Sequence, residues 1–301
     1  AFWQEQQKGR VIQGTMGDVV HLDLRHLGEK YLIERLPFSC ELAKAYVGVD
    51  PVKEPIPVRP TAHYTMGGIE TDGKCATRMP GLYAAGECAS VGLHGANRLG
   101  SNSLSEIVVF GKVAGEQAAE FAATQQHGNT EALAAKAEAL IKQHLSLLDI
   151  DGTENPADIR NELGMSMEAG VGIYRTEELM QGTIDKINEL KARYKKIKIN
   201  DKSSVFNTDL LYAIELGYML DVAEAMAHSA INRKESRGSH QRLDGYEERD
   251  DVNYLKHSLS FYNQEGAPTI DYSDVKITKS QPAKRVYGSE GEKQDEAKKN
   301  G

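Results

Sequence analysis

The glycine-rich segment at residues 92–104 has the sequence GLHGANRLGSNSL and leads into an apolar helix expected from about Ser101. Its three glycines allow backbone N–H groups to approach an anionic ligand closely. Arg98 is the one cation of the segment besides a histidine, and Ser101 stands where helix-capping oxygens are common. Two interpretations follow from these residues alone: a simple helix cap, or an anion clamp in which Arg98 holds a carboxylate or phosphate.

The composition is typical of a globular protein, and 301 residues suffice for two or three domains. A net charge of −8 argues against nucleic acid as the main partner. No run of eighteen apolar residues is present, and we expect neither a membrane span nor a signal peptide. The three cysteines lack metal-site spacing, so we expect buried packing positions and no iron–sulfur cluster, zinc or other metal on this chain. A first residue other than methionine indicates a processed chain or a fragment.

The first part of the chain mixes strand and helix patterns. A strand is expected at residues 17–24, followed by a helix over 26–47 that Pro37 interrupts. Residues 51–60 hold four of the nine prolines and are expected to form an extended, stiff strap. A long helix is expected at 101–123, with an interior face that contains Leu104, Ile107, Val108 and Val109.

The second part of the chain has mainly helical patterns. Helices are expected at residues 130–149, 155–169, 175–198 and 203–234, and we expect them to pack as an antiparallel bundle. Asn155, which precedes Pro156, and Thr176 are expected to cap the starts of two of these helices. Two strands near residues 268–272 and 274–277 are expected to pair with each other. The charged residues 289–301 are expected to be disordered.

Two further segments contain residues suited to a cofactor. The glycine pair of HYTMGGI, residues 63–69, predicts a close approach of two backbone segments. His63 precedes this pair, and a planar ring could lie against the backbone there, although a structural turn is the plainer interpretation. Glu87 ends the apolar segment GLYAAGE, residues 81–87, which we expect to be a strand. A carboxylate at the end of a strand can accept hydrogen bonds from sugar hydroxyls, and a helix cap or a surface acid is the alternative.

A charged segment at residues 233–240, RKESRGSH, is followed by Arg249, Asp250 and Asp251. A network of structural salt bridges is the default interpretation, and a docking face for a partner is the alternative. The sequence contains no GxGxxG, GxxxxGK[ST], HExxH or GxSxG motif, which limits the chemistry that the chain can perform unaided.

Taken together, HYTMGG (63–68), GLYAAGE (81–87) and HGANRLGSNSL (94–104) resemble the flavoprotein subunit of the fumarate reductase and succinate dehydrogenase family. The Thr-Met pair before the two glycines, Ser101 after Gly100, and the segments YSDVKI (272–277) and PAKRVY (282–287) resemble the bacterial quinol:fumarate reductases in particular. The resemblance extends over nearly the whole chain. L-Aspartate oxidase is a weaker match than fumarate reductase or succinate dehydrogenase, because its sequence usually differs from this one at the position of Met66 and in the C-terminal region.

The resemblance implies an α+β/α fold. It assigns residues 1–58 to the end of a capping domain with a Pro-rich strap, 59–125 to the C-terminal part of an FAD-binding α/β domain, 126–235 to an antiparallel helical bundle, and 236–301 to a small irregular C-terminal region with a disordered tail. It also implies that this chain is the C-terminal half of a larger subunit. The dinucleotide-binding βαβ unit, the histidine that attaches FAD covalently and the proton-delivering arginine would all precede Ala1.

The resemblance further assigns roles to individual residues. His63 and Arg98 match the pair that binds the dicarboxylate substrate and stabilises its charge. Tyr64 and Glu87 match flavin-contacting positions, with Glu87 at the ribityl hydroxyls. Ser103 and Leu104, with Arg98 nearby, match the segment under the pyrimidine edge of the flavin, where a helix N-terminus would stabilise the negative charge of the reduced ring.

The implied reaction is the reduction of fumarate to succinate by hydride transfer from reduced FAD. The resemblance implies that electrons arrive from a separate iron–sulfur subunit, fed by quinol at membrane anchor subunits. The whole subunit would then lie peripherally on the cytoplasmic face of the bacterial inner membrane. Two alternatives are a succinate dehydrogenase flavoprotein, which runs the same couple in reverse, and an isolated chain that is an inert structural or docking half and binds FAD weakly or not at all.

Overall fold

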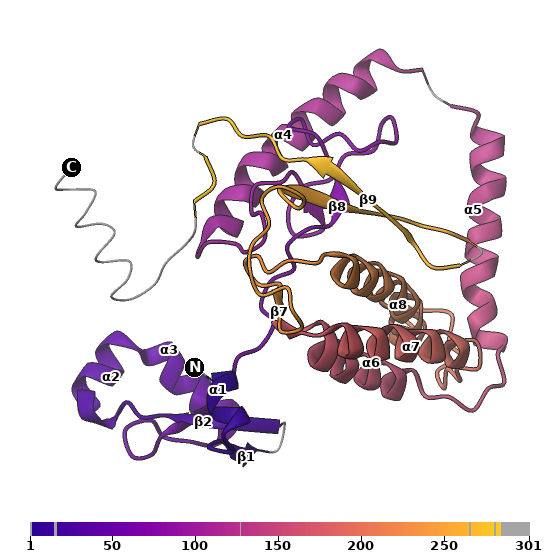
Figure 1. Ribbon diagram of the computed structural model, residues 1–301. Helices are drawn as coiled ribbons and strands as arrows, with labels where there is room; N and C mark the ends of the chain where they lie inside the picture. The colour runs from indigo at the N-terminus through magenta and orange to yellow at the C-terminus, as the bar shows by residue number, and fades with distance from the viewer. Residues whose placement is uncertain (1, 15–16, 127, 265, 280, 284–301) are drawn as a thin grey trace. The chain divides into compact units, whose positions relative to one another are not determined.

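The computed structural model describes residues 2–14, 17–126, 128–264, 266–279 and 281–283 (Figure 1). The chain divides into two units by the density of its internal contacts, Ala1–Thr65 and Met66–Gly301. The tail at residues 289–301, which we expect to be disordered, lies outside the described residues.

The first unit combines a small antiparallel sheet with short helices. Its sheet has the order β1-β2-β3, and Val20 of β2 pairs with Val58 of β3. Its elements are α1 (Phe2–Gln7), β1 (Ile12–Gly14), β2 (Gly17–Leu22), η1 (Arg25–Leu27), α2 (Glu29–Arg35), α3 (Pro37–Leu42), η2 (Ala43–Val47) and β3 (Ile56–Val58). Part of the Pro-rich segment that we expect to be a strap therefore forms a strand of this sheet.

The expected helix over residues 26–47 is broken at Pro37, as predicted. Leu36 has a non-helical backbone with φ −130°, and Pro37 occupies the first turn of α3. Proline is tolerated there, since its missing N–H would have no partner within the helix. The fully buried Leu32 of α2, with Cys40 and Ala43, supplies the small core of this unit.

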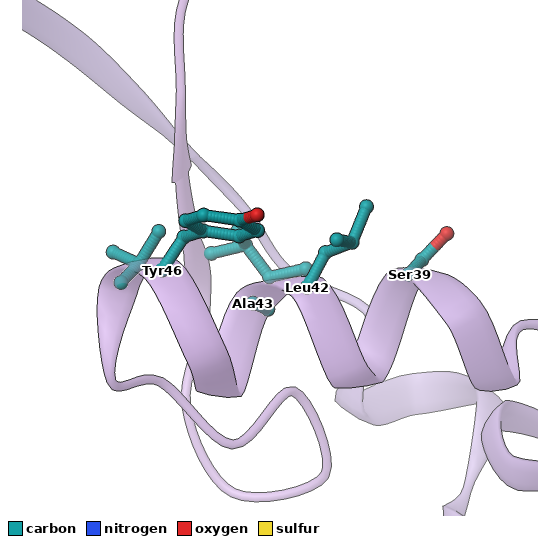
Figure 2. A pocket seen from close by; sticks show the side chains of 6 residues that line it. Ser39, Leu42, Ala43 and Tyr46 are labelled. Atoms are coloured by element: carbon teal, nitrogen blue, oxygen red, sulfur yellow. The ribbon is translucent and has the colours of Figure 1, made fainter. Parts of the chain in front are cut away.

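An apolar hollow of about 320 Å³ lies on α3 and η2 in the first unit. Figure 2 shows Leu42 and Tyr46 projecting from this helical segment, and the tyrosine side chain is exposed. The hollow is lined by Ser39, Leu42, Ala43, Tyr46, Val47 and Ile56. A lining of this kind offers no acid, base or cation for chemistry.

The second unit begins with two short parallel strands, β4 (Ile69–Glu70) and β5 (Ala89–Ser90), followed by the long helix α4 (Asn102–Thr124). The prediction that the apolar face of this helix is interior is wrong for the described part of the chain. Leu104 is 65% exposed and Val108 is 72% exposed, whereas Glu106 is only 2% exposed. Helical periodicity identifies an apolar face, but it does not identify the polypeptide that covers the face.

Three of the helices that follow, α6 (Pro156–Val171), α7 (Glu177–Tyr194) and α8 (Thr208–Asn232), share one hydrophobic core. They lie packed together in Figure 1. They are preceded by α5 (Thr130–Leu145), which has no buried residue, and by η3 (Ser146–Asp149), whose Leu147 and Leu148 pack against the core. The predicted starts at Asn155 and Thr176 are confirmed, because each side chain accepts a hydrogen bond from a backbone N–H of the first turn. Fully buried core residues include Ile159, Met180, Ile187, Leu190 and Ala213.

The C-terminal region adds short strands to this core. Tyr174–Arg175 (β6) pairs in parallel with Gln241–Arg242 (β7). The hairpin of β8 (Lys256–Phe261) and β9 (Thr269–Asp274) places Ser258 opposite Tyr272. The predicted pairing of residues 268–272 with 274–277 is therefore wrong: β9 pairs with an upstream strand whose polar sequence, KHSLSF, gives little strand signal.

None of the helices in the described ranges has the length and apolar character required to cross a lipid bilayer.

Two glycines of α6 provide a matched test of the core. A Cβ at Gly170 would lie 2.1 Å from Thr183 Oγ1 and 2.5 Å from the Leu179 carbonyl oxygen of α7, whereas a Cβ at Gly164 would enter open space. Gly170→Ala is expected to lower the free energy of unfolding by about 1–3 kcal/mol, because the helices must separate. Gly164→Ala is expected to raise it by about 0.4–1 kcal/mol through chain entropy. Urea denaturation of both variants checks this, and equal effects would contradict it.

Candidate functional site

The loop at residues 92–104 enters α4 through a strained residue. Ser101 occupies the N-cap position with a left-handed backbone, φ +64°, and in the described structure its side chain makes no capping bond. A left-handed conformation is uncommon for a residue other than glycine, and such strain tends to occur at functional sites. The simple capping interpretation of Ser101 is therefore wrong, and the loop retains the conformation through backbone bonds such as Asn102 N–H to the Leu99 carbonyl at 3.2 Å.

Arg98 is half-buried within this loop. One guanidinium N–H donates to the carbonyl of its neighbour Leu99 at 3.1 Å, so the side chain is held against its own loop. Ser103 is half-buried in the first turn of α4, and Leu104 in the same turn is exposed. The predicted cation and the predicted helix N-terminus are therefore parts of one continuous segment.

His94 and Glu106 attach this loop to α4. The imidazole Nε2 lies 2.6 Å from Glu106 Oε2, and the two side chains are 9% and 3% exposed. Glu106 is the buried residue of α4. The missed signal is a lone acid on an otherwise apolar helix face, which requires a polar partner when buried.

Glu87 lies in a turn before β5, so the prediction that it ends a strand is wrong. Its exposed side chain follows Gly86, where φ is +85° and an added Cβ would lie 3.3 Å from Ile107 of α4. The turn that contains Glu87 therefore packs beside the second turn of α4, close to Ser103 in the helix. The glycine is needed because a side chain is disfavoured at this φ.

The expected close backbone approach at the glycine pair is confirmed for Gly68. This glycine has φ +135°, and an added Cβ would lie 2.4 Å from the Cys88 carbonyl oxygen. The Cys88 carbonyl also accepts the Ile69 N–H at 2.9 Å, which begins the β4–β5 pairing. His63 is exposed and Tyr64 is half-buried, and both belong to the first unit. The expectation that His63 and Tyr64 lie in the same site as Arg98 stays a prediction.

The cysteines differ from one another in environment. Cys40 and Cys75 are buried as expected, whereas Cys88 is exposed. Burial raises the pKa of the Cys75 thiol, which donates to the Phe110 carbonyl of α4 at 3.4 Å. The described residues contain no cluster of three or more histidine, cysteine or acidic side chains that could hold a metal ion.

The charged segment that begins at residue 233 forms a buried network. Glu235 has no solvent exposure and pairs with Arg233 at 2.5 Å and Arg237 at 2.8 Å. Arg242 is also almost fully buried and pairs with Asp244 at 2.7 Å. Buried and interlocked pairs of this kind support the structural interpretation of the segment, because a docking face would present its charges to solvent.

His240 stands within this network as a neutral imidazole. Its Nδ1 lies 2.8 Å from an Arg175 guanidinium nitrogen, and its Nε2 lies 3.0 Å from the Arg233 carbonyl oxygen. A guanidinium only donates, so Nδ1 accepts and the single proton is on Nε2. Burial, with the positive charge of Arg175 as a second cause, lowers the pKa of His240 to about 4.

The Glu106 anchor leads to a stability prediction. Glu106→Ala is expected to lower the free energy of unfolding by about 1–3 kcal/mol, because buried His94 loses this acceptor. Glu106→Gln retains an acceptor oxygen, so its free energy of unfolding is expected to fall less. Glu116→Ala removes an exposed acid from the same helix and is the control, with an expected change below about 1 kcal/mol. Urea denaturation distinguishes them, and a harmless Glu106→Ala would contradict the anchor.

The His240 environment leads to a prediction about pH. The unfolded histidine binds a proton near pH 6.5, whereas the folded one resists it until about pH 4. The contribution of neutral His240 to the free energy of unfolding is therefore fully present above pH 6.5. It is lost as the pH falls toward 4, and its size is on the order of 3 kcal/mol. His240→Gln is expected to reduce this pH dependence of the free energy of unfolding, whereas replacement of the exposed His26 by glutamine is expected to leave it unchanged. A His240→Gln protein with the original pH profile would contradict the assignment.

Comparisons with known proteins agree with the motifs. Two family models match: the FAD binding domain over residues 1–104 and the fumarate reductase flavoprotein C-terminal domain over residues 160–287. The fumarate reductase flavoprotein subunit of a Serratia strain is 67% identical over 300 residues, which are 99% of this chain and 50% of that protein. A succinate dehydrogenase flavoprotein subunit of Rickettsia bellii is 41% identical over 303 residues, covering 94% of this chain and 50% of the relative.

A solved structure of E. coli quinol fumarate reductase matches with a TM-score of 0.90 and 67% identity, over 95% of this chain and 49% of the other. The chain thus spans about half the length of the curated relatives it matches. The fold resembles the FAD-binding and C-terminal domains of that flavoprotein. The chain belongs to the family of fumarate reductase and succinate dehydrogenase flavoprotein subunits.

Proposed function

We propose that this chain forms one wall of the FAD and dicarboxylate site of a fumarate reductase flavoprotein subunit. The loop at residues 92–104 is the observation on which the proposal depends: it holds Arg98 against its own backbone and turns at left-handed Ser101 directly into α4. The second wall would belong to a part of the subunit outside these 301 residues, consistent with the half-length match to the relatives.

The described residues fit an FAD site. Gly68 lies against the backbone of Cys88, and Gly86 lies against the side chain of Ile107, so neither position has ordinary room for a Cβ. Glu87 is exposed beside Gly86. A carboxylate in this turn is suited to accept hydrogen bonds from the ribityl hydroxyls. FAD, when bound, supplies two-electron hydride chemistry. Tyr64 is proposed as a second flavin contact, from the family motif.

Arg98 is proposed as the substrate clamp. A guanidinium presents N–H donors in a fork that matches a carboxylate, and its charge persists at every physiological pH. His63 is proposed as the second donor to the same dicarboxylate. The two together would hold one carboxylate and stabilise the negative charge that moves onto it as the carbon–carbon double bond of fumarate is reduced.

The N-terminus of α4 is proposed to act electrostatically. Ser103 and Leu104 lie in its first turn, at the end where the aligned peptide dipoles give a helix a partial positive charge. Placed under the pyrimidine edge of the flavin, this end of the helix would favour the anionic reduced ring. That effect raises the flavin potential and suits the reduction of fumarate.

The remaining regions are proposed to support assembly. We interpret the helical region as an antiparallel bundle within residues 126–235, and its surface as a docking face for an iron–sulfur subunit that receives electrons from quinol through membrane anchors. The shared core of α6, α7 and α8 supports the bundle. The domain bounds at 1–58, 59–125 and 236–301 belong to the same proposal, as does a peripheral position on the cytoplasmic face of the inner membrane. A matching structure of quinol-fumarate reductase with menaquinol molecules supports the partner assignment.

Fumarate reduction is preferred over succinate oxidation because identity to the fumarate reductase relatives reaches 67%, against 41% for a succinate dehydrogenase relative. The same residues would bind the dicarboxylate and the flavin in succinate oxidation, so the proposed residue roles do not depend on the direction of the reaction. An isolated chain of 301 residues is proposed to be catalytically inert. Survival of a flavin absorbance band through gel filtration of that isolated chain would contradict this proposal.

The clamp role of Arg98 is tested in the full-length flavoprotein subunit that contains this chain. Arg98→Ala is expected to lower kcat/KM for fumarate on the order of a hundredfold or more, because a charge-stabilising donor is lost. Arg98→Lys keeps the charge but loses the fork, and it is expected to recover only part of the activity. Fumarate-dependent reoxidation of the reduced flavin, followed by absorbance, gives both values.

Arg35→Ala is the matched control for that experiment, since Arg35 is an exposed arginine at the end of α2. Its kcat/KM is expected to equal that of the unmodified subunit. Near-normal fumarate turnover in Arg98→Ala would overturn the assignment of Arg98.

A further inference from the structure

A serine far along the chain holds the loop that contains Arg98. The backbone N–H of Ser239 donates to the Ala96 carbonyl oxygen at 3.1 Å, and the Ser239 hydroxyl donates to the same oxygen at 3.0 Å. The two residues are 143 positions apart in sequence. One carbonyl in the glycine-rich loop is thus held by two donors from the C-terminal region.

The turn that presents Ser239 fits the loop without spare space. Gly238 has φ +59°, and a Cβ at this position would lie 2.5 Å from the Ala96 carbonyl oxygen and 2.8 Å from the Ala96 Cβ. Arg237 and His240 close the turn, because the N–H of each donates to the carbonyl of the other, at 2.8 and 3.0 Å. The contact with Ala96 therefore has a defined geometry.

Buried charge fixes the base of this turn. Arg237 donates through two guanidinium nitrogens to the carboxylate of Glu235, at 2.8 and 2.9 Å, and the Glu235 side chain is fully buried. The Asp250 N–H donates to the same carboxylate at 2.9 Å. A buried carboxylate that lost these donors would pay a large desolvation penalty, so the turn has little freedom to shift.

We propose that Ser239 is a positioning residue for Arg98. Ala96 stands two residues before Arg98, and the chain advances at most about 3.6 Å per residue, so a displaced Ala96 carbonyl moves the Arg98 backbone with it. The Arg98 guanidinium follows, because it donates to the Leu99 carbonyl of the same loop. The proposal rests on the proposed function, in which Arg98 binds the substrate dicarboxylate.

Three substitutions in the full-length flavoprotein subunit test the contact. Gly238→Ala drives a methyl group into the Ala96 carbonyl and displaces the loop. Ser239→Ala removes one of the two hydrogen bonds, and Ser239→Thr keeps the hydroxyl. Gly48→Ala is the control, because Gly48 is also left-handed, with φ +72° and ψ +17°, yet a Cβ there meets open space. It reproduces the backbone strain of Gly238→Ala without the collision.

The readouts separate substrate positioning from general stability. Binding is measured with malonate, a dicarboxylate without the two adjacent CH₂ groups that could be oxidised, by its perturbation of the flavin absorbance. Gly238→Ala is expected to raise the malonate Kd and lower kcat/KM for fumarate tenfold or more, since small misplacements of a positioning group are costly. Ser239→Ala is expected to raise the malonate Kd and to lower kcat/KM, each about threefold to tenfold. Ser239→Thr is expected to restore both values. FAD content is expected to stay constant, and Gly48→Ala, which has the strain without the collision, is expected to keep the original malonate Kd and kcat/KM.

The outcomes distinguish this proposal from the proposed function. An unmodified subunit that fails to reduce fumarate overturns the proposed function itself. An active subunit in which Arg98→Ala abolishes turnover while Gly238→Ala and Ser239→Ala keep normal malonate Kd and kcat/KM overturns only the positioning role. An equal loss in Gly48→Ala also overturns it, because strain alone would then explain the effect. If Gly238→Ala does not fold, the Ser239→Ala and Ser239→Thr pair decides.

Discussion

The buried carboxylate of Glu235 is the constraint on which the second unit depends. It has no contact with solvent, and it is balanced by Arg233, Arg237 and the Asp250 N–H. Removal of both arginines would leave a buried carboxylate without an opposite charge in a medium of low polarity, which costs several kcal/mol. Arg233 also donates to the Ser258 hydroxyl in β8, so one charge joins the end of α8, the C-terminal hairpin and the turn that contacts Ala96.

Local features were predicted well from the sequence, because short-range physics determines them. A proline in the interior of a helical pattern breaks the helix, as Pro37 does here. Asn155 and Thr176 cap helices with side chains that reach only the first turn. The close approach at Gly68 was also predicted, since a glycine pair between extended segments permits a backbone contact that a Cβ would prevent. The anion-clamp interpretation of Arg98 stays a prediction.

Features that depend on distant partners were not predictable in the same way. The hydrophobic pattern of α4 is that of a buried helix, yet Val108 is largely exposed in the described chain. The strand around residue 270 was recognised, but its partner was not, because register depends on which strand the topology brings beside it. The pairing of His94 with Glu106 and the contact of Ser239 with Ala96 join positions that no local pattern connects.

The separation between Ala96 and Ser239 has a consequence for how the molecule is made. Domains fold as they leave the ribosome, at roughly 5–20 residues per second, so a gap of 143 residues corresponds to a delay of roughly 7–30 seconds between synthesis of the loop and synthesis of its clasp. During that interval the glycine-rich loop lacks the donors that fix its carbonyl. The glycine-rich loop therefore gains its final contacts late in biosynthesis, after the helical region between the two residues has emerged.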